Sequence, residues 1–280
     1  MTRNLPWPLT VVRLLVLLVG AAVMVAPFVY MLSISFTEQS YVLTMPPQLV
    51  PDPPTLANYS KALTTQDVPR YFFNSLYVAC VSTLASLLLS SMMAYSFARF
   101  RFAGRELLFR ILLLGLMIPA VMLLIPQFIL TKYLGLLDTH LGLIIFYVAG
   151  SLAINTFLLR GFFESIPGEL DEAMQVDGAN AWTRYWRLAI PLARPGLATA
   201  TIFTFFAAWD EFAWALTILN TPELQTLPIA IRLFAGSGNN AVQWGLVFAA
   251  SAIAIVPVII VFLVFQRHFI QGLTSGAVKG

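Results

Sequence analysis

The chain has 280 residues, of which 59% are hydrophobic and only 10% are charged. A soluble globular domain carries about 25% charged residues, so this composition excludes an ordinary water-soluble protein and indicates a single membrane-embedded helical domain. The net charge of +3 is carried by basic residues at the ends of apolar segments, which disfavours a nucleic-acid binder with a clustered basic face.

Six apolar stretches are long enough to cross about 30 Å of hydrocarbon as helices. The first, with Arg3 and Arg13 before its apolar run, is longer than a signal-peptide core and predicts an uncleaved helix. Because lipid offers no partner for backbone N–H and C=O groups, we expect an all-α, six-span bundle. The predicted spans are residues 10–33, 72–98, 107–130, 139–160, 196–219 and 244–266.

The distribution of basic residues predicts the orientation of this bundle. With the N-terminus in the cytoplasm, Lys61, Arg70, Lys132 and Arg232 are the Lys and Arg residues on the outside, and the rest lie inside or at the inner boundary. The positive-inside rule therefore places both termini in the cytoplasm. Two long outer loops follow, residues 34–71 and 220–243, which serve either as connectors or as a docking surface for a partner.

The cytoplasmic loop at residues 161–195 predicts a helix–turn–helix. Pro167 suits the start of a helix, Glu169 and neighbouring acids suit its first turns, and Gly178 can end it in a left-handed conformation. Asn180 can cap a second helix that places Trp182, Tyr185 and Trp186 on one face. The residues expected to make contact with a partner are Glu169, Leu170, Glu172, Ala173, Met174, Asp177, Gly178 and Ala179.

Two interpretations of this loop compete. It could be an amphipathic hairpin on the membrane surface, or a helix presented to a groove on a soluble partner. The first helix is acidic and the inner leaflet is negatively charged, which favours the partner.

Several motifs resemble those of one transporter family. Glu172-Ala173-Met174, followed by Asp177-Gly178-Ala179 and Ile190-Pro191-Leu192, is similar to the EAA loop of bacterial ATP-binding-cassette importer permeases. Ala94–Phe102 is similar to this family's second-span exit, and Ile118-Pro119, Ile125-Pro126 and Leu134–Thr139 are similar to its third span and following turn. The tail Gly272–Gly280 resembles that of the carbohydrate branch, the maltose-permease type. The resemblance implies a coupling helix over 169–178, docked on an ATPase through Glu172 and Gly178. It also implies as partners a second permease subunit, an ABC ATPase dimer and an extracytoplasmic solute-binding protein, in the bacterial inner membrane.

Asp210 and Glu211 fall near the middle of the predicted fifth span, beside Trp209 and Trp214. A carboxylate at membrane depth costs about 2.5–3.5 kcal/mol, so it marks either a polar pathway or a structural pair. In the sugar-permease family this stretch usually reads W-N-E-F, and Asp210 replaces the Asn, which disfavours an anionic solute. Further polar residues of the spans are tentative pathway or interhelical groups, namely Asn74, Gln127, Asn155 and Thr156.

The sequence lacks the residues that a disulfide, a metal site, an ATP-binding loop or a nucleophilic active site would need. The single Cys80 permits no internal disulfide, and His140 and His268 have no partners at metal-ligand spacing, so we expect no metal or cofactor. The sequence contains no phosphate-binding loop and no nucleophile elbow, so ATP hydrolysis is expected on another chain. The leading hypothesis is therefore a permease subunit of an ATP-driven sugar importer that works by alternating access. The alternative is a proton-coupled secondary transporter using Asp210 and Glu211, for which inverted repeats would be expected and none is found.

Overall fold

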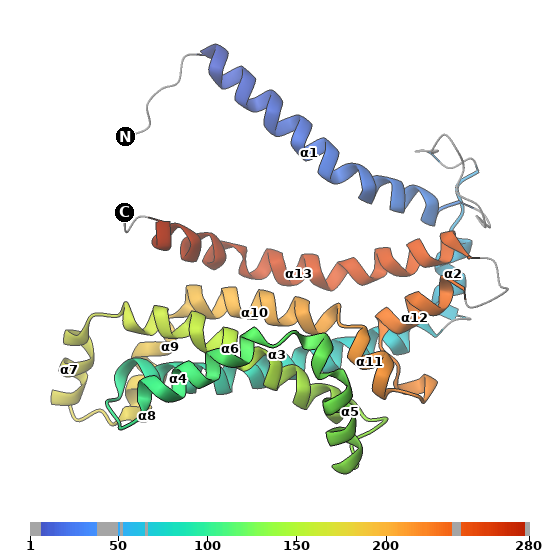
Figure 1. Cartoon of the computed structure of the whole chain (residues 1–280). Coiled ribbons are helices and arrows are strands. Elements are labelled where there is room, and N and C mark those ends of the chain that lie inside the picture. Colours follow the sequence, from blue (N-terminus) through green and yellow to red (C-terminus); the bar gives the residue numbers. More distant parts are fainter. Residues whose placement is uncertain (1–6, 38–49, 51–52, 65–66, 237–241, 278–280) are drawn as a thin grey trace. The chain divides into compact units, whose positions relative to one another are not determined.

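The computed structural model describes residues 7–37, 50, 53–64, 67–236 and 242–277, with side chains described up to residue 267, and the regular elements in these ranges are helical. Contacts divide the chain into two compact units, residues 1–69 with 230–256 and residues 70–229 with 257–280. The helices are α1 (Trp7–Ser35), α2 (Ala57–Thr64), α3 (Val68–Arg99), α4 (Arg105–Leu114), α5 (Leu124–Tyr133), α6 (His140–Glu164), α7 (Gly168–Val176), α8 (Ala181–Arg184), α9 (Ile190–Leu192), α10 (Arg194–Trp209), α11 (Ala213–Ile218), α12 (Leu227–Phe234) and α13 (Trp244–Ala277) (Figure 1).

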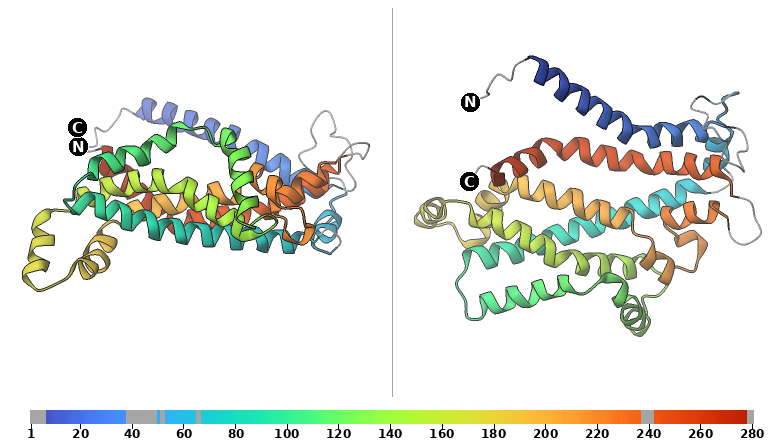
Figure 2. Two further views of the ribbon diagram at one scale, coloured as in Figure 1. Left: turned by 60° about the horizontal axis from the view of Figure 1, so that its bottom comes forward. Right: turned by 45° about the horizontal axis from the view of Figure 1, so that its top comes forward.

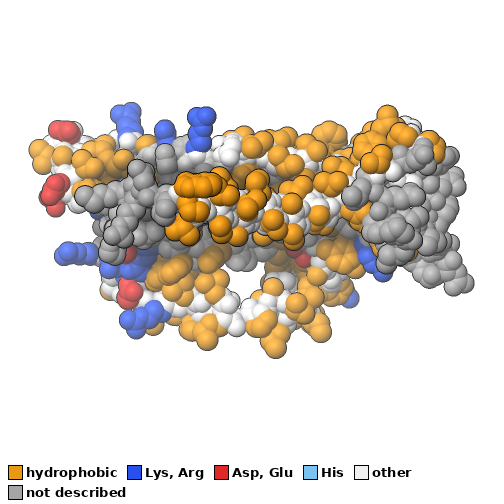
Figure 3. Space-filling model, turned by 90° about the horizontal axis from the view of Figure 1, so that it is seen from above, with side chains coloured by type: hydrophobic (Ala, Val, Ile, Leu, Met, Phe, Trp, Pro, Cys, Tyr) orange, Lys and Arg blue, Asp and Glu red, His pale blue; other side chains and the backbone are white. Residues whose placement is uncertain are grey.

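Four helices are long and apolar enough to cross a membrane, and the number rises to six if each of two bent pairs counts as one span. The predicted first, second, fourth and sixth spans fall on α1, α3, α6 and α13. The all-α fold with up to six spans is thus confirmed. Helix α1 is unburied over its most apolar window, and bands of hydrophobic side chains cover the face drawn in Figure 3, as expected for surfaces that meet lipid or another membrane chain.

The predicted third span over 107–130 is broken rather than continuous. Residues Arg105–Met117 and Ala120–Tyr133 form two helical arms that meet at 93°. Pro119 has no N–H to donate and forces Ile118 out of the helical region, to φ −90° and ψ 117°. A single straight helix over this range was the wrong expectation because Pro119 interrupts it.

The predicted fifth span over 196–219 is also interrupted. Helix α10 ends at Trp209, and α11 starts only at Ala213. Asp210 and Glu211, expected in the middle of a helix, therefore lie in the break between two helices. A second bend of 77° separates Ala181–Leu192 from Arg194–Trp209 at the N-terminal end of the same segment.

The first unit is held together by Asn58 of α2. Its side-chain amide donates to the carbonyl oxygens of Ser35 (3.0 Å), the last residue of α1, and of Thr37 (2.8 Å), two residues beyond it. Gly245 of α13 lies so close to Asn58 that a Cβ atom there would be 2.5 Å from the amide nitrogen. The long loop 34–71 thus contains an ordered helix, while Pro46, Pro47 and Pro51 of that loop lie outside the described residues.

The second unit is built around α6, which packs against both α3 and α10. Ser86 of α3 hydrogen-bonds to Ser151 of α6 (2.6 Å), and Asn155 of α6 donates to both Ser86 (3.0 Å) and Thr204 of α10 (2.8 Å). In the right view of Figure 2, α10 and α6 lie next to each other and α3 passes obliquely behind them. Polar side chains buried in an apolar bundle thus satisfy one another between helices.

Candidate functional site

The loop between the fourth and fifth predicted spans forms the expected hairpin. Helix α7 begins after Pro167, carries Glu169 and Asp171 in its first turn and ends before Gly178, which has φ +79°. The N–H of Ala179 donates to the carbonyl of Met174 (2.9 Å), and that of Gly178 donates to Gln175 (3.0 Å). These two bonds form a Schellman motif, so the predicted left-handed stop at Gly178 is confirmed.

The second arm of the hairpin also follows its sequence signals. The Asn180 side chain accepts a hydrogen bond from the N–H of Thr183 (2.8 Å) and caps α8. The rings of Trp182, Tyr185 and Trp186 lie together, with centroids 5.0–5.7 Å apart. The chain then makes a π turn over Tyr185–Ala189. Pro191 lies inside α9 instead of ending the helix, because the wider turn accommodates a residue that lacks an N–H.

Buried contacts fix the base of the hairpin to the C-terminal part of α3. The hydroxyl of Tyr185 is 2.7 Å from that of Ser91, and the Arg99 guanidinium donates to the carbonyl of Ile166 (2.6 Å). Arg184 of α8 lies 3.5 Å from Asp171 of α7 and joins the two arms. The hairpin is therefore a firmly mounted projection rather than a loose loop, as the left view of Figure 2 shows.

The tip of the hairpin is uncovered by the rest of the described chain. Helix α7 contains no buried residue, and Val176 is 87% exposed. Leu170 and Trp182 are also exposed. A helix that buries nothing gains little stability from its own chain, which indicates a surface for another molecule. Glu172 is exposed and borders a polar cavity of about 380 Å³ shared with arginines of the α3–α4 turn, Arg99, Arg101 and Arg105.

The two membrane carboxylates have different surroundings. Glu211 accepts hydrogen bonds from the Tyr147 hydroxyl (2.6 Å), the Trp214 N–H (2.7 Å) and the Ala215 N–H (3.0 Å). Asp210, at the end of α10, is exposed; its backbone N–H donates to the carbonyl of Phe206 (3.0 Å), but its carboxylate makes no hydrogen bond or ion pair with the residues that the structure describes. Of the two interpretations offered for these carboxylates, the structural pair is not observed, because only Glu211 is hydrogen-bonded through its carboxylate.

The two tryptophans beside these carboxylates are buried among aromatic rings. Trp209 stacks on Phe205 with ring centroids 5.8 Å apart, and Trp214 packs edge-on against Phe146 at 5.0 Å. The indole N–H of Trp214 points to the carbonyl of Gly142 at 3.4 Å. In this conformation both rings pack within the bundle of helices.

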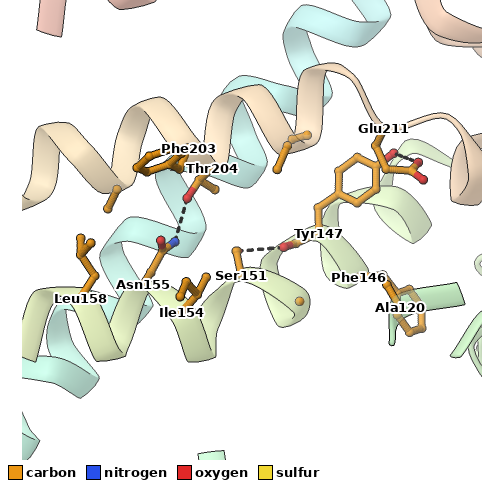
Figure 4. Close-up of a pocket in the computed structure, with 14 residues that line it drawn as sticks. Ala120, Phe146, Tyr147, Ser151, Ile154, Asn155, Leu158, Phe203, Thr204 and Glu211 are labelled. Carbon is orange, nitrogen blue, oxygen red and sulfur yellow. Dashed lines mark hydrogen bonds between the residues drawn. The ribbon is translucent and has the colours of Figure 1, made fainter. Parts of the chain in front are cut away.

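A cavity of about 710 Å³ lies between α6 and α10, beside both broken spans (Figure 4). Ala120, at the break of the third span, and Glu211, at the break of the fifth, line the same cavity. Irregular backbone at membrane depth is tolerated where it lines a cavity or is buried in protein, and broken helices often mark transport pathways. This cavity is therefore the candidate transport site of the second unit.

Asn155 and Glu211 are the sequence-predicted pathway residues that line this cavity, and the structure adds Tyr147, Ser151 and Thr204. These three were missed because single hydroxyl side chains are common in apolar helices and cost little free energy to bury, so they do not by themselves mark a site. Their spacing did hold a signal, since Tyr147, Ser151 and Asn155 recur every four residues on one face of α6. Of the other candidates, Gln127 is half-buried on α5 away from the cavity, and Asn74 donates to the carbonyls of Glu223 and Gln225.

Among the described residues no group of three or more His, Cys, Asp and Glu side chains could hold a metal ion. The His140 ring nitrogen Nε2 lies 2.8 Å from the carbonyl of Leu224. His268 belongs to α13, but its side chain lies outside the described residues, as do those of the tail Gly272–Gly280.

Residues 86–275 match the family model described as "Binding-protein-dependent transport system inner membrane component". The chain belongs to this family. It is therefore a multi-pass permease of the inner membrane and a transport component, and the resemblance of the loop at residues 161–195 to importer permeases is confirmed.

Curated relatives match this permease over nearly its whole length. It is 37% identical over 254 residues to the sulfoquinovosyl glycerol transport system permease protein SmoH of Agrobacterium fabrum, covering 91% of this chain and 88% of the relative. It is 36% identical over 277 residues to the trehalose/maltose transport system permease protein MalG of Thermococcus litoralis, covering 96% and 98%. It is 33% identical over 263 residues to the diacetylchitobiose uptake system permease protein NgcG of Streptomyces coelicolor, covering 94% and 87%.

Solved structures agree with these relatives. One chain in the crystal structure of a bacterial ABC transporter involved in the import of the acidic polysaccharide alginate superposes on this permease with a TM-score of 0.82 and 27% identity, covering 96% of this chain and 99% of that one. A chain of the bacterial alginate ABC transporter in complex with an alginate pentasaccharide-bound periplasmic protein matches with a TM-score of 0.68 and 16% identity, over 93% of each, which supports the fold alone.

Proposed function

We propose that this permease is one membrane subunit of an ATP-driven importer whose solute is a sugar or oligosaccharide. The relatives named above are permeases for a sulfoquinovosyl glycerol, for trehalose or maltose and for diacetylchitobiose. These solutes share a carbohydrate character but differ in size and charge. We therefore propose a class of solute, the carbohydrates, and not one particular sugar.

The observation that carries the proposal is the exposed, acidic helix α7 on its firmly mounted hairpin. Helix α7 buries no residue and presents Leu170 and Val176 beside Glu172. A groove on an ATPase would cover the apolar side chains, and a basic residue there would pair with Glu172. We propose that the coupling set lies on this surface, namely Glu169, Leu170, Glu172, Ala173, Met174, Asp177, Gly178 and Ala179.

The partners follow from this role. A second permease subunit would complete the pathway, an ABC ATPase dimer would receive the hairpins, and an extracytoplasmic binding protein would deliver the solute. Both termini and the hairpin would face the cytoplasm. Opening and closing of the ATPase dimer would move α7, and the bundle would alternate between inward and outward openings.

The solute would pass along the cavity beside α6 and α10. Asn155 contributes a side-chain oxygen there, and Tyr147 and Phe203 contribute ring surfaces that suit the C–H faces of sugars. An exposed carboxylate at membrane depth is too costly to face lipid, so Asp210 would face a water-filled pathway or the partner subunit. A pathway with a free Asp210 favours neutral over anionic solutes.

Reconstitution in proteoliposomes tests the energy source. The permease, its sister subunit, the ATPase and the binding protein would be combined, and uptake of labelled maltose and trehalose measured with ATP alone and with a proton gradient alone. We expect accumulation with ATP only. Accumulation driven by the gradient without ATP would instead establish the secondary transporter.

The substitution Gly178→Asp tests the role of the hairpin. It places a side chain on a residue with φ +79° and a charge at the proposed docking surface, so we expect coupled ATPase activity and uptake to be lost while the bundle still assembles. Gly135→Asp is the matched control, because Gly135 also has a positive φ of 69° but lies far from the hairpin, between α5 and α6. Normal transport by the Gly178→Asp complex would refute the docking assignment.

A further inference from the structure

The break in the fifth predicted span is closed by the side chain of Glu211. The first N–H groups of any helix have no partner inside that helix, and lipid offers them no water. The Glu211 carboxylate accepts the N–H groups of Trp214 (2.7 Å) and Ala215 (3.0 Å), which belong to the first turn of α11. The chain can therefore leave the helical path over residues 210–212 without exposing these N–H donors.

The same carboxylate ties α11 to the neighbouring helix α6. The hydroxyl of Tyr147 donates to Glu211 at 2.6 Å, and the Trp214 ring packs against Phe146 one residue earlier on α6. The far end of α11 is also held, because the N–H of Asp138, just before α6, donates to the carbonyl of Ile218 (3.0 Å). Helix α11 is thus fastened at both ends to the N-terminal part of α6.

Asp210 provides the contrast. It precedes Glu211 directly and is exposed, and its carboxylate has no hydrogen-bond or ion-pair partner among the described residues. The two adjacent carboxylates therefore carry separate tasks, one internal to the fold and one directed outward. Since Tyr147 and Glu211 both line the 710 Å³ cavity, their hydrogen bond also sets the shape of its wall (Figure 4).

We propose that Glu211 is a positioning residue that, with Tyr147, holds α11 against α6 so that the two helices move as one body when the pathway opens. The proposal rests on the proposed transport function and specifies how this part of the pathway is driven. Movement of the bundle would reach the cavity wall through the Tyr147–Glu211 bond rather than being lost at the break. Glu211 would then act without touching the solute.

The test uses the complete complex with the variants Glu211→Gln and Tyr147→Phe, alone and combined. The carboxylate has two accepting oxygens for three donors, whereas the amide of Gln has one. Tyr147→Phe removes only the hydroxyl and should preserve the fold. We expect each single variant to lower the maltose or trehalose taken up per ATP hydrolysed by about tenfold. The double variant should take up as much solute per ATP hydrolysed as Glu211→Gln does, because both substitutions break the same Tyr147–Glu211 hydrogen bond.

Hydrogen exchange provides an independent measurement on the purified complex. In Glu211→Gln, the amides of Trp214 and Ala215 should exchange about tenfold faster. Asp210→Asn is the matched control, since it removes the adjacent charge without breaking a hydrogen bond, and it should leave this protection unchanged. A general loss of stability would lower ATPase activity and uptake together, so the uptake per ATP distinguishes positioning from simple damage.

Three results would overturn the proposal. The first is unchanged uptake per ATP in both single variants, and the second is effects that multiply in the double variant. The third is a change in the ratio of maltose to trehalose uptake in Glu211→Gln but not in Tyr147→Phe, which would make Glu211 a solute contact. Failure of the proposed function is a separate outcome, because it would appear as ATP-independent uptake by the unsubstituted complex.

Discussion

Asp138 has a left-handed backbone, with φ +57°, in the turn that precedes α6. Its carboxylate accepts the N–H groups of Asn220 (2.8 Å) and Thr221 (3.0 Å) and the hydroxyl of Thr221. The hydrogen bond from the Thr221 hydroxyl is the main reason that the pKa of Asp138 lies below its usual value, and the Thr221 N–H adds to it. One side chain therefore fastens the turn after α5 to the segment after α11.

This arrangement predicts a pH dependence. A carboxyl group with a lowered pKa in the folded protein contributes stability above its unfolded pKa of about 3.9, and the contribution is lost as the pH falls through the lower folded value. We expect Asp138→Asn to lower the hydrogen-exchange protection of Asn220 and Thr221 at neutral pH. The difference from the unsubstituted chain should begin to shrink below about pH 4 and vanish only at a pH below the lowered pKa of the folded Asp138 carboxyl. A difference that persists there would mean that the charge of Asp138 is not the cause.

At the scale of elements, close approach of α6 and α10 is what holds the second unit together. Gly196, in the first turn of α10, faces the ring of Phe162 of α6, and a Cβ atom at Gly196 would lie 2.4 Å from that ring. Farther along the same pair, Asn155 donates to Thr204. The two helices thus meet through a small residue at one end and a polar bond near the middle, as membrane helices commonly do.

The substitution Gly196→Ala should therefore destabilise the permease by about 1–3 kcal/mol through overpacking. Gly161→Ala, one residue before Phe162, is its control, because a Cβ atom there would meet nothing within 4 Å. That change should be neutral or stabilise by up to about 1 kcal/mol, as Ala is the better helix former. Thermal unfolding of the detergent-solubilised complex would measure both, and equal melting temperatures for the two variants would contradict the packing argument.

The elements also show which predictions a sequence supports. Gly178 as a helix stop and Asn180 as a cap were predictable because each bonds within a few residues of its own position. The bond between Tyr147 and Glu211 joins residues 64 positions apart, and no local pattern encodes it. The break at residues 210–212 was missed for the same reason, since a long, mostly apolar stretch is read as one helix even when it contains two carboxylates, unless the distant partner of Glu211 is known.

For the whole molecule, the most important prediction is the orientation in the membrane, because an ATPase can contact α7 only if the hairpin is cytoplasmic. The native Cys80 would first be replaced by serine, and single cysteines placed at Gln175 of α7 and at Glu223, both of which are exposed. In spheroplasts, whose inner membrane is intact and accessible from outside, a membrane-impermeant maleimide should label position 223 and not position 175. Labelling of position 175 from outside would reverse the topology and remove the ATPase from reach of α7.

The mounting of the hairpin has one further mechanical result. The polypeptide itself leads from α9 into α10, but Tyr185 and Ile166 are also fastened sideways to Ser91 and Arg99 of α3. A push on the tip would consequently be shared by the helices of the second and fifth predicted spans, α3 and α10, which also contact each other through Phe72 and Trp209. An ATPase that moves the nine residues of α7 would in this way tilt α3 and α10 together rather than bend α10 alone.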